Sequence, residues 1–161
     1  MSDNIKANTN TKINIKGIIL SGGPTCISDP CNYNNISKNI ISMNIFKNTP
    51  ILGICLGFQI MCDIYGSTIS RLNKKNTGLS EIIIDNTFLL TKTMPKISKV
   101  FYSHQDCVIS PPIGFNILKY NDMIIGIENI KLNRFGFQFH PEGSLNGCII
   151  IKNFIKYCYL D

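Results

Sequence analysis

The first half of the chain alternates short Ile-rich runs with stretches that look helical. Ile15–Leu20, which is closed by Ser21-Gly22-Gly23-Pro24, and Ile51–Ile54 are predicted to be buried strands. Asn34–Phe46, whose apolar residues recur at helical spacing, and Leu56–Tyr65, which stops near a glycine, are predicted to be helices. The order strand, helix, strand, helix predicts an α/β fold of three layers, with a mainly parallel sheet and helices on both faces.

The second half of the chain predicts shorter strands separated by turns. The β-like runs are Glu81–Ile84, Val100–Tyr102, Phe115–Lys119, Met123–Glu128 and Arg134–Phe139. The last stretch, from Gly147 to Tyr157, again has helical spacing. Residues 1–11 are polar and without apolar periodicity, so we expect a flexible tail there. Residues 12–161 are expected to form one domain, since the chain of 161 residues fits a single core.

Composition narrows the class of protein without identifying it. The hydrophobic content of 44% is ordinary for a globular protein. The net charge is +6, but the lysines are scattered and no basic stripe alternates with aromatic residues, so no nucleic-acid partner is expected. No apolar run reaches the roughly 18 residues of a membrane helix, and the N-terminal segment does not resemble a signal peptide. The seven cysteines lack C-x-x-C spacing, which favours a cytoplasmic protein with reduced thiols and no metal site.

A cysteine between two glycines marks the change from strand to helix at Gly53-Ile54-Cys55-Leu56-Gly57. This G-x-C-x-G arrangement is the cysteine counterpart of the G-x-S-x-G elbow, in which a strained turn exposes a nucleophile. At a helix N-terminus the macrodipole favours the thiolate of Cys55, and the backbone N–H of Leu56 would point toward a reacting carbonyl. A buried structural cysteine is the alternative, and this motif alone does not decide between the two.

Two histidines are candidates for the base that a cysteine nucleophile needs. His140 ends an alternating run and lies two residues before Glu142, with Pro141 stiffening the backbone between them. The base needs a third group to hold its tautomer, and Glu142 can supply it. His104, which has Asp106 at the same spacing, is the competing candidate. The spacing favours His140.

Three motifs together resemble the class I, or triad-type, glutamine amidotransferases, and the resemblance covers about Gly17 to Ile155. The motifs are Leu20-Ser21-Gly22-Gly23-Pro24, Gly53-Ile54-Cys55-Leu56-Gly57-Phe58-Gln59 and Gln138-Phe139-His140-Pro141-Glu142. The resemblance implies a flavodoxin-like fold. Within the family, the first motif and Tyr102-Ser103-His104-Gln105-Asp106 look most like the amidotransferase domains of GMP synthetases.

The resemblance also implies a role for each matched residue. The implied triad is Cys55 as the nucleophile, His140 as the base and Glu142 as its orienter. The implied oxyanion hole consists of the N–H groups of Gly23 and Leu56. The residues implied to contact the bound substrate are Gly22, Gln59, Ser103 and His104. The reaction would be hydrolysis of L-glutamine to glutamate and ammonia through a Cys55 thioester, without a metal or organic cofactor, and the ammonia would pass to a separate synthetase subunit.

One departure from the family concerns the N-terminus. Members usually begin with a strand and a helix before the Leu-Ser-Gly-Gly-Pro motif, and sixteen mostly polar residues before Gly17 are too few for both. The fold is therefore expected to be N-terminally shortened, with an exposed strand edge that the first residues or a partner would cover.

Three other functions remain open at this point. The chain could belong to the anthranilate or aminodeoxychorismate synthase type of amidotransferase, because Gly53-Ile54-Cys55-Leu56-Gly57 is equally at home there. It could be a γ-glutamyl hydrolase, or a catalytically silent regulatory protein. The intact set of Cys55, His140 and Glu142 argues against a silent protein.

Overall fold

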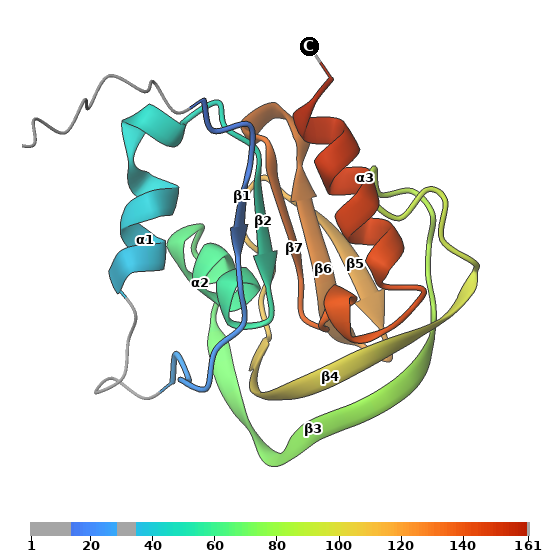
Figure 1. The fold of residues 1–161 in the computed structure, drawn as a ribbon. Helices are drawn as coiled ribbons and strands as arrows, with labels where there is room; N and C mark the ends of the chain where they lie inside the picture. The colour runs from blue at the N-terminus through green and yellow to red at the C-terminus, as the bar shows by residue number, and fades with distance from the viewer. Residues whose placement is uncertain (1–13, 29–34, 161) are drawn as a thin grey trace, which may run out of the picture.

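The computed structural model describes residues 14–28 and 35–160, and its centre is a five-stranded sheet in the order β1-β2-β7-β6-β5 (Figure 1). The strands are β1 (Ile18–Leu20), β2 (Ile51–Ile54), β5 (Asn116–Tyr120), β6 (Met123–Asn129) and β7 (Arg134–Phe137). β1, β2 and β7 pair in parallel, whereas β6 runs antiparallel to β7 and to β5. All strands of this sheet except β6 therefore point the same way, which confirms the predicted mainly parallel sheet.

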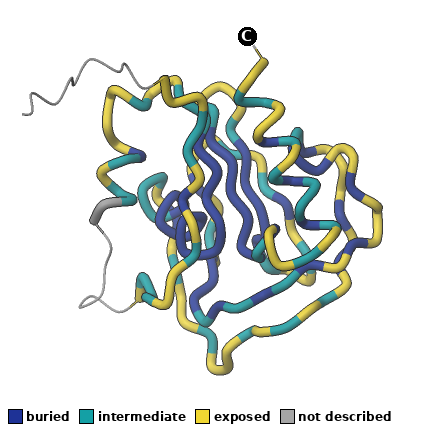
Figure 2. The backbone as a smooth tube through the Cα atoms, in the orientation of Figure 1, coloured by how far each residue is buried: buried dark blue, intermediate teal, exposed yellow. Residues whose placement is uncertain are grey.

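Helices cover both faces of the sheet, as predicted (Figure 1). One face carries α1 (Asn35–Ser42) and α2 (Leu56–Ile64), and the other carries α3 (Cys148–Cys158). Each face has its own apolar core, with Phe58 of α2 in one and Phe154 of α3 in the other. Burial is concentrated in the central strands β2, β7 and β6 (Figure 2). Because each fully buried large apolar side chain contributes about 1.5–3 kcal/mol, these two cores hold the three layers together.

A long antiparallel ribbon lies outside this sheet. It consists of β3 (Ile69–Ile83) and β4 (Ile97–Val108), with a shift in register between Arg71 and Asn76. The ribbon crosses the end of the sheet at which β1 and β2 terminate (Figure 1). The 3-10 turn η4 (Pro141–Gly143) follows β7 and contacts β4, where the His140 N–H donates to the Phe101 carbonyl at 2.7 Å. The ribbon therefore borders the carboxyl end of the sheet.

Several elements differ from their predicted bounds. The strand predicted from Ile15 begins only at Ile18, since that residue pairs with Ile51, the first residue of β2. The helix predicted to reach Phe46 ends at Ser42 and is followed by the 3-10 turn η2 (Asn44–Phe46). β3 and β4 are far longer than the predicted runs Glu81–Ile84 and Val100–Tyr102. The tail expected over residues 1–11 lies outside the described residues.

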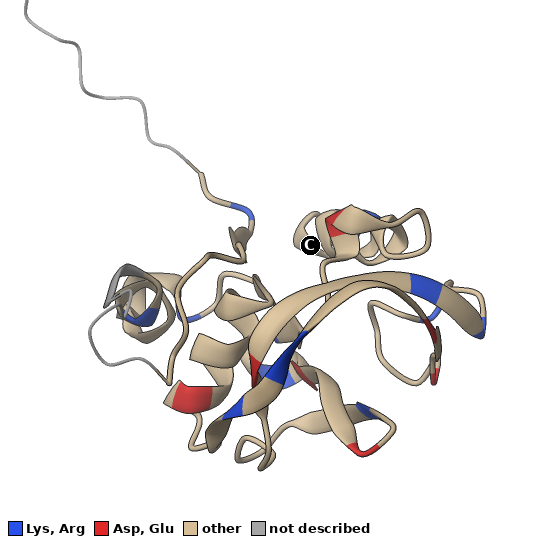
Figure 3. Cartoon of the chain, turned by 90° about the horizontal axis from the view of Figure 1, so that it is seen from below, with Lys and Arg blue, Asp and Glu red and all other residues tan. Residues whose placement is uncertain are grey.

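The surface of the described residues has two features that bear on partners. β1 is the outer strand on its side of the sheet, and Ile19 is 44% exposed. Lys and Arg are spread over separate elements and interspersed with Asp and Glu when the molecule is viewed from below (Figure 3). None of the helices in residues 14–28 and 35–160 is both long and apolar enough to cross a membrane.

Candidate active site

The turn between β2 and α2 holds Cys55 in a strained backbone conformation. Its φ of 51° and ψ of −101° lie in a region that residues other than glycine rarely adopt, at a cost of about 1–3 kcal/mol. Hydrogen bonds on both sides fix the turn, because the Cys55 N–H donates to the Phe137 carbonyl at 2.9 Å and the Cys55 carbonyl accepts from the Gln59 N–H at 3.0 Å. The strained turn predicted from the G-x-C-x-G spacing is therefore confirmed.

Two glycines let the segments around Cys55 approach one another. A Cβ on Gly57 would lie 2.2 Å from the carbonyl oxygen of Leu20, so α2 can contact β1 this closely only with glycine at that position. A Cβ on Gly22 would lie 2.8 Å from Cε1 of His140 and 3.4 Å from Cβ of Cys55. Gly22 therefore packs closely against both Cys55 and the imidazole of His140, and it is not among the residues that line the cavity described next.

A cavity of about 500 Å³ opens beside Cys55, between the loop after β1, the start of α2, and β3 and β4. This size suits a small molecule. The sequence-predicted site residues that line it are Gly23, Cys55, Leu56, Gln59, Ser103, His104 and His140. Segments far apart in the sequence therefore meet at one cavity, as the three motifs predicted.

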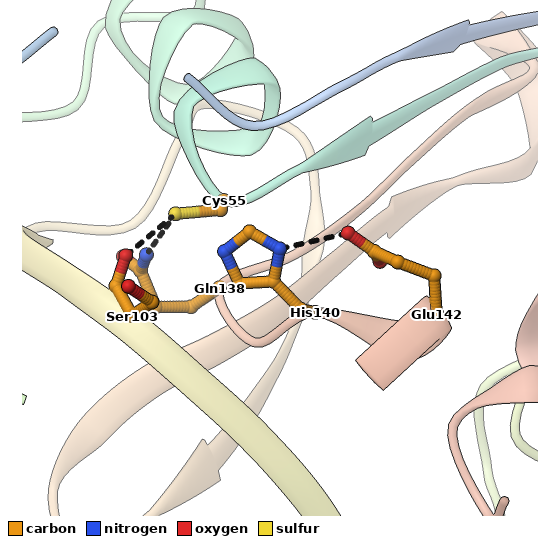
Figure 4. A network of polar contacts seen from close by, with 5 residues as sticks. All are labelled: Cys55, Ser103, Gln138, His140 and Glu142. Atoms are coloured by element: carbon orange, nitrogen blue, oxygen red, sulfur yellow. Dashed lines mark hydrogen bonds and ion pairs between the residues drawn. The ribbon is translucent and has the colours of Figure 1, made fainter. Parts of the chain in front are cut away.

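His140 and Glu142 form the predicted pair (Figure 4). Nδ1–H of His140 donates to Oε1 of Glu142 at 2.8 Å, which fixes the neutral ring as the Nδ1–H tautomer. Nε2 of the same ring is buried and has no hydrogen-bond partner among the described residues. In Figure 4 the ring lies between Cys55 and Glu142. His140 lines the cavity, so its Nε2 atom is free to exchange a proton there.

His104 has neither ring nitrogen free. The ring is only 4% exposed, and Nδ1–H donates to the backbone carbonyl of Asp106 at 2.8 Å. Because a carbonyl can only accept, Nε2 is the ring acceptor, and it receives the Asn76 amide at 3.2 Å. Burial lowers the pKa of His104, so the neutral ring is favoured. This geometry favours His140 over His104 as a base.

Burial and the helix N-terminus have opposite effects on the Cys55 thiol. Burial of the side chain raises the pKa of the Cys55 thiol to about 11, and this effect outweighs the backbone N–H of Leu56, which lowers the pKa. Glu142 raises the pKa further. The helix N-terminus thus acts in the expected direction, but burial, which the sequence did not reveal, has the larger effect. The neutral thiol donates a hydrogen bond to the Ser103 carbonyl, with 3.8 Å between Sγ of Cys55 and the carbonyl oxygen.

A buried amide pair beside Cys55 was missed by sequence reasoning. Nε2 of Gln59 donates to the Asp106 carbonyl at 2.7 Å and to Oε1 of Gln138 at 3.2 Å. Nε2 of Gln138 lies 4.0 Å from Sγ of Cys55. Gln138 belongs to the third motif, but the sequence alone assigned it no role. A polar residue between two phenylalanines, two positions before His140, was the signal that could have identified it.

The carboxylate of Asp106 also has an unpredicted partner. It is 2% exposed and accepts from the Ser28 N–H at 2.9 Å and from the Ser28 hydroxyl at 2.7 Å. The side chain therefore tethers the loop after β1 to β4 and is not the orienter of His104 that its spacing suggested. No pattern around Ser28 indicated this contact. Within the described part of the chain, no group of three or more His, Cys, Asp or Glu residues could hold a metal ion.

Comparison with known proteins agrees with this geometry. The family model described as glutamine amidotransferase class-I matches residues 2–156. The chain is 39% identical over 151 residues to a Methanococcus aeolicus protein named as one of the subunits of GMP synthase [glutamine-hydrolyzing], covering 91% of this chain and 76% of the relative. It is 36% identical over 149 residues to the GMP synthase [glutamine-hydrolyzing] of Macrococcus caseolyticus, covering 90% of this chain and 28% of that protein.

A solved structure supports the fold. It belongs to a Thermoplasma acidophilum protein named provisionally as one of the subunits of a GMP synthase, with a TM-score of 0.76, 24% identity, and coverage of 89% of this chain and 72% of that one. Because this family model matches residues 2–156 of the chain, the chain belongs to the class-I glutamine amidotransferases.

Proposed function

We propose that the chain hydrolyses L-glutamine to glutamate and ammonia through a thioester on Cys55, and that the ammonia serves a GMP-forming synthetase. The observation that carries the proposal is the meeting of Cys55 and the Glu142-bound His140 at one cavity. Membership of the class-I amidotransferases supports the type of reaction. The names of the relatives support the identity of the acceptor.

The first half of the reaction forms the thioester. Nε2 of His140 takes the proton of the Cys55 thiol as the sulfur attacks the γ-carboxamide carbon of glutamine, so a C–S bond forms and the carbonyl oxygen becomes negative. The N–H groups of Gly23 and Leu56 stabilise this oxyanion. The C–N bond then breaks, and the imidazolium of His140 protonates the leaving nitrogen to give ammonia. Glu142 stabilises the positive ring in the interval.

The second half regenerates the enzyme. The same Nε2 of His140 takes a proton from water, and the resulting hydroxide attacks the thioester carbon. The C–S bond breaks, glutamate leaves, and the proton held on the ring returns to the Cys55 sulfur. The side chains involved are all in this chain, and neither half calls for a metal or an organic cofactor.

The ammonia acceptor would lie on a separate synthetase subunit. The Methanococcus aeolicus relative, of which this chain covers 76%, is named as one subunit of a GMP synthase. In the Macrococcus caseolyticus enzyme the matching region is only 28% of a longer protein. We therefore propose a two-subunit arrangement in which this chain supplies ammonia to a partner that binds ATP and XMP. The glutaminase activity of the isolated chain would then be weak.

Glutamate release from glutamine tests the proposal. Wild type and Cys55→Ala are assayed alone and with a GMP synthetase subunit that lacks its own amidotransferase, ATP and XMP. We expect slow release by wild type, faster release with the synthetase, and none from Cys55→Ala. Ammonium salts should restore GMP formation in mixtures that contain Cys55→Ala. Equal glutamate release by wild type and Cys55→Ala would overturn the proposal.

Two further measurements separate the alternatives. Diazo-oxo-norleucine, a glutamine-like electrophile, should label Cys55 selectively, whereas a silent regulatory protein would not react. A γ-glutamyl peptide should be a poorer substrate than free glutamine, whereas a γ-glutamyl hydrolase would prefer the peptide.

A further inference from the structure

Gln138 is a buried polar residue beside Cys55 that has no assigned role in the proposed reaction. Its side chain is fully buried, with 0% exposure, at a position two residues before His140. Its backbone N–H is bonded to the Ile125 carbonyl at 3.0 Å, which fixes the main chain at this point. The side chain lies next to the thiol of Cys55 (Figure 4). Burying a primary amide is costly unless both of its ends find partners.

The direction of the Gln138 amide follows from the groups around it. The backbone carbonyl of Asp106 can only accept, so the Gln59 atom 2.7 Å away must be the nitrogen, Nε2. The same Nε2 lies 3.2 Å from one end of the Gln138 amide, and that end must be the oxygen. The other end, which lies 4.0 Å from Sγ of Cys55, is therefore the NH₂ group. The Asp106 carbonyl fixes the Gln59 amide, and the Gln59 NH₂ group in turn directs the NH₂ group of Gln138 toward the sulfur.

A donor at this position has a chemical consequence. A buried thiolate is costly because it loses hydration, and burial is the largest influence on the Cys55 thiol. N–H groups that face the sulfur offset part of that cost, and a hydrogen bond to an anion is stronger than one to the neutral thiol. The Leu56 N–H acts in this way from the backbone. The Gln138 amide can act in the same way from the residue that follows β7.

We infer that Gln138 is a positioning residue for the nucleophile: its amide N–H donates to the Cys55 sulfur and stabilises the thiolate that forms when His140 takes the proton. This role rests on the proposed function of Cys55, but the thiol chemistry that it predicts can be measured without turnover. Because Gln59 lines the cavity and holds the other end of the Gln138 amide, the orientation of the donor is also coupled to the cavity wall.

Alkylation of Cys55 by iodoacetamide tests the inference. Gln138→Met has nearly the same length as glutamine but no N–H donor, and Gln138→Leu is a second variant of different shape. The rate for the Cys55 peptide is followed by mass spectrometry from pH 7 to 10 on the full chain. At pH 8.5 we expect both variants to react about three- to tenfold more slowly than wild type. The lower figure allows for the greater nucleophilicity of a more basic thiolate.

Other charged and titratable groups near the sulfur must be held constant. Glu142 and Cys26 raise the pKa of Cys55, Lys75 lowers it, and His140 lines the same cavity. All four are unchanged in the variants, so the difference from wild type isolates the amide. Gln105→Leu is the matched control, because the Gln105 amide contacts Arg71 and the Leu72 carbonyl instead of the sulfur.

Each outcome decides the inference. Slower alkylation in both Gln138 variants, with melting temperatures close to wild type and no change in Gln105→Leu, supports it. A wild-type rate in either folded Gln138 variant overturns it, since a purely structural amide would affect stability without affecting the thiol. If wild type releases no glutamate and the alkylation effect is present, the proposed function fails and the role of Gln138 stands. If glutamate is released and alkylation is unchanged, only this inference fails.

Discussion

The chemistry of single residues at this site begins from an unfavourable thiol. With a pKa of about 11, only about one Cys55 side chain in 10⁴ is ionised at pH 7 in the free protein. The thiol is therefore mostly protonated at rest, and the proposed reaction needs a base to take its proton. Nε2 of His140 is a buried ring nitrogen with no hydrogen-bond partner among the described residues. Because the high pKa keeps the proton on the Cys55 thiol, the proposed attack depends on the imidazole of His140 to remove that proton.

The Glu142 carboxylate is predicted to act through the charge that it places beside this imidazole. Glu142→Gln keeps an oxygen that can accept from Nδ1 of His140, but it removes the negative charge that stabilises the imidazolium. We expect kcat for glutamate release to fall roughly 10- to 1,000-fold with little change in KM. The loss should be smaller than for a fully buried orienter, because the Glu142 side chain is 48% exposed.

A matched variant separates this effect from a general loss of charge. Glu81 is exposed on β3, outside the lining of the cavity, so Glu81→Gln should leave kcat unchanged. Steady-state glutamate assays on both variants provide the comparison. Unchanged kcat in Glu142→Gln would mean that the pair at 2.8 Å is only structural.

Among the secondary-structure elements, the contact between α2 and the sheet decides where Cys55 lies. The helix begins one residue after Cys55, and its first turn presses against the end of β1. A side chain at Gly57 would displace the N-terminus of α2, and with it the backbone N–H of Leu56. The geometry of the proposed site therefore depends on this helix–strand distance as well as on the side chains of Cys55, His140 and Glu142.

The helix–strand contact predicts a large effect for Gly57→Ala. Its Cβ would lie 2.2 Å from the Leu20 carbonyl oxygen, so the backbone must shift. We expect a loss of at least about 3 kcal/mol in the free energy of unfolding, together with loss of glutaminase activity. Gly114→Ala is the control, since its φ of 80° imposes strain but the nearest atom is 3.8 Å away. That variant should lose only about 1–2 kcal/mol and keep its activity. Urea unfolding that gave equal losses for the two variants would contradict the steric argument.

The elements that the sequence predicted well are those whose signal is local. β2 and α2 have the expected bounds to within a residue, because a fully apolar run meets a glycine-flanked turn there. The ribbon was mostly missed. Its strand β3 contains the polar stretch from Ser70 to Gly78, and most of its residues are exposed, so no alternation of apolar residues marks it. Pairing with β4 stabilises it, and such nonlocal pairing leaves little local signal.

The site followed the same rule. The strained turn at Cys55 and the pairing of His140 with Glu142 were predictable, because each lies in a short motif with its own geometry. The amide chain through Gln138 and the tether from Ser28 to Asp106 were not, because their partners are 79 and 78 residues away in sequence. The burial that raises the pKa of Cys55 was also not predictable, since burial depends on the packing of the whole fold, whereas the helix N-terminus is visible in the local sequence.

Across the whole molecule, buried ionisable groups predict how stability depends on pH. Burial raises the pKa of the Cys55, Cys62 and Cys107 thiols above the usual value of 9.0 and raises that of Tyr102 above 10.0. A group whose pKa is higher in the folded state stabilises the fold below its unfolded pKa and loses that contribution as pH rises. Burial lowers the pKa of His104, so its contribution is lost instead as pH falls below about 6.5.

The free energy of unfolding should therefore be nearly flat from about pH 7 to 8.5 and fall above pH 9, by at most about 1.4 kcal/mol per pH unit for each thiol that stays neutral in the fold. Cys62 is the sharpest probe, because it is fully buried in α2 and does not line the cavity. Cys62→Ala should be less stable than wild type at pH 7, since the smaller side chain leaves a void, yet its stability should fall less steeply between pH 9 and 10.5. Urea unfolding at half-unit pH steps gives both slopes. If stability fell equally steeply with pH in both proteins, Cys62 would ionise as easily in the folded state as in the unfolded chain. That result would contradict the effect expected from its complete burial.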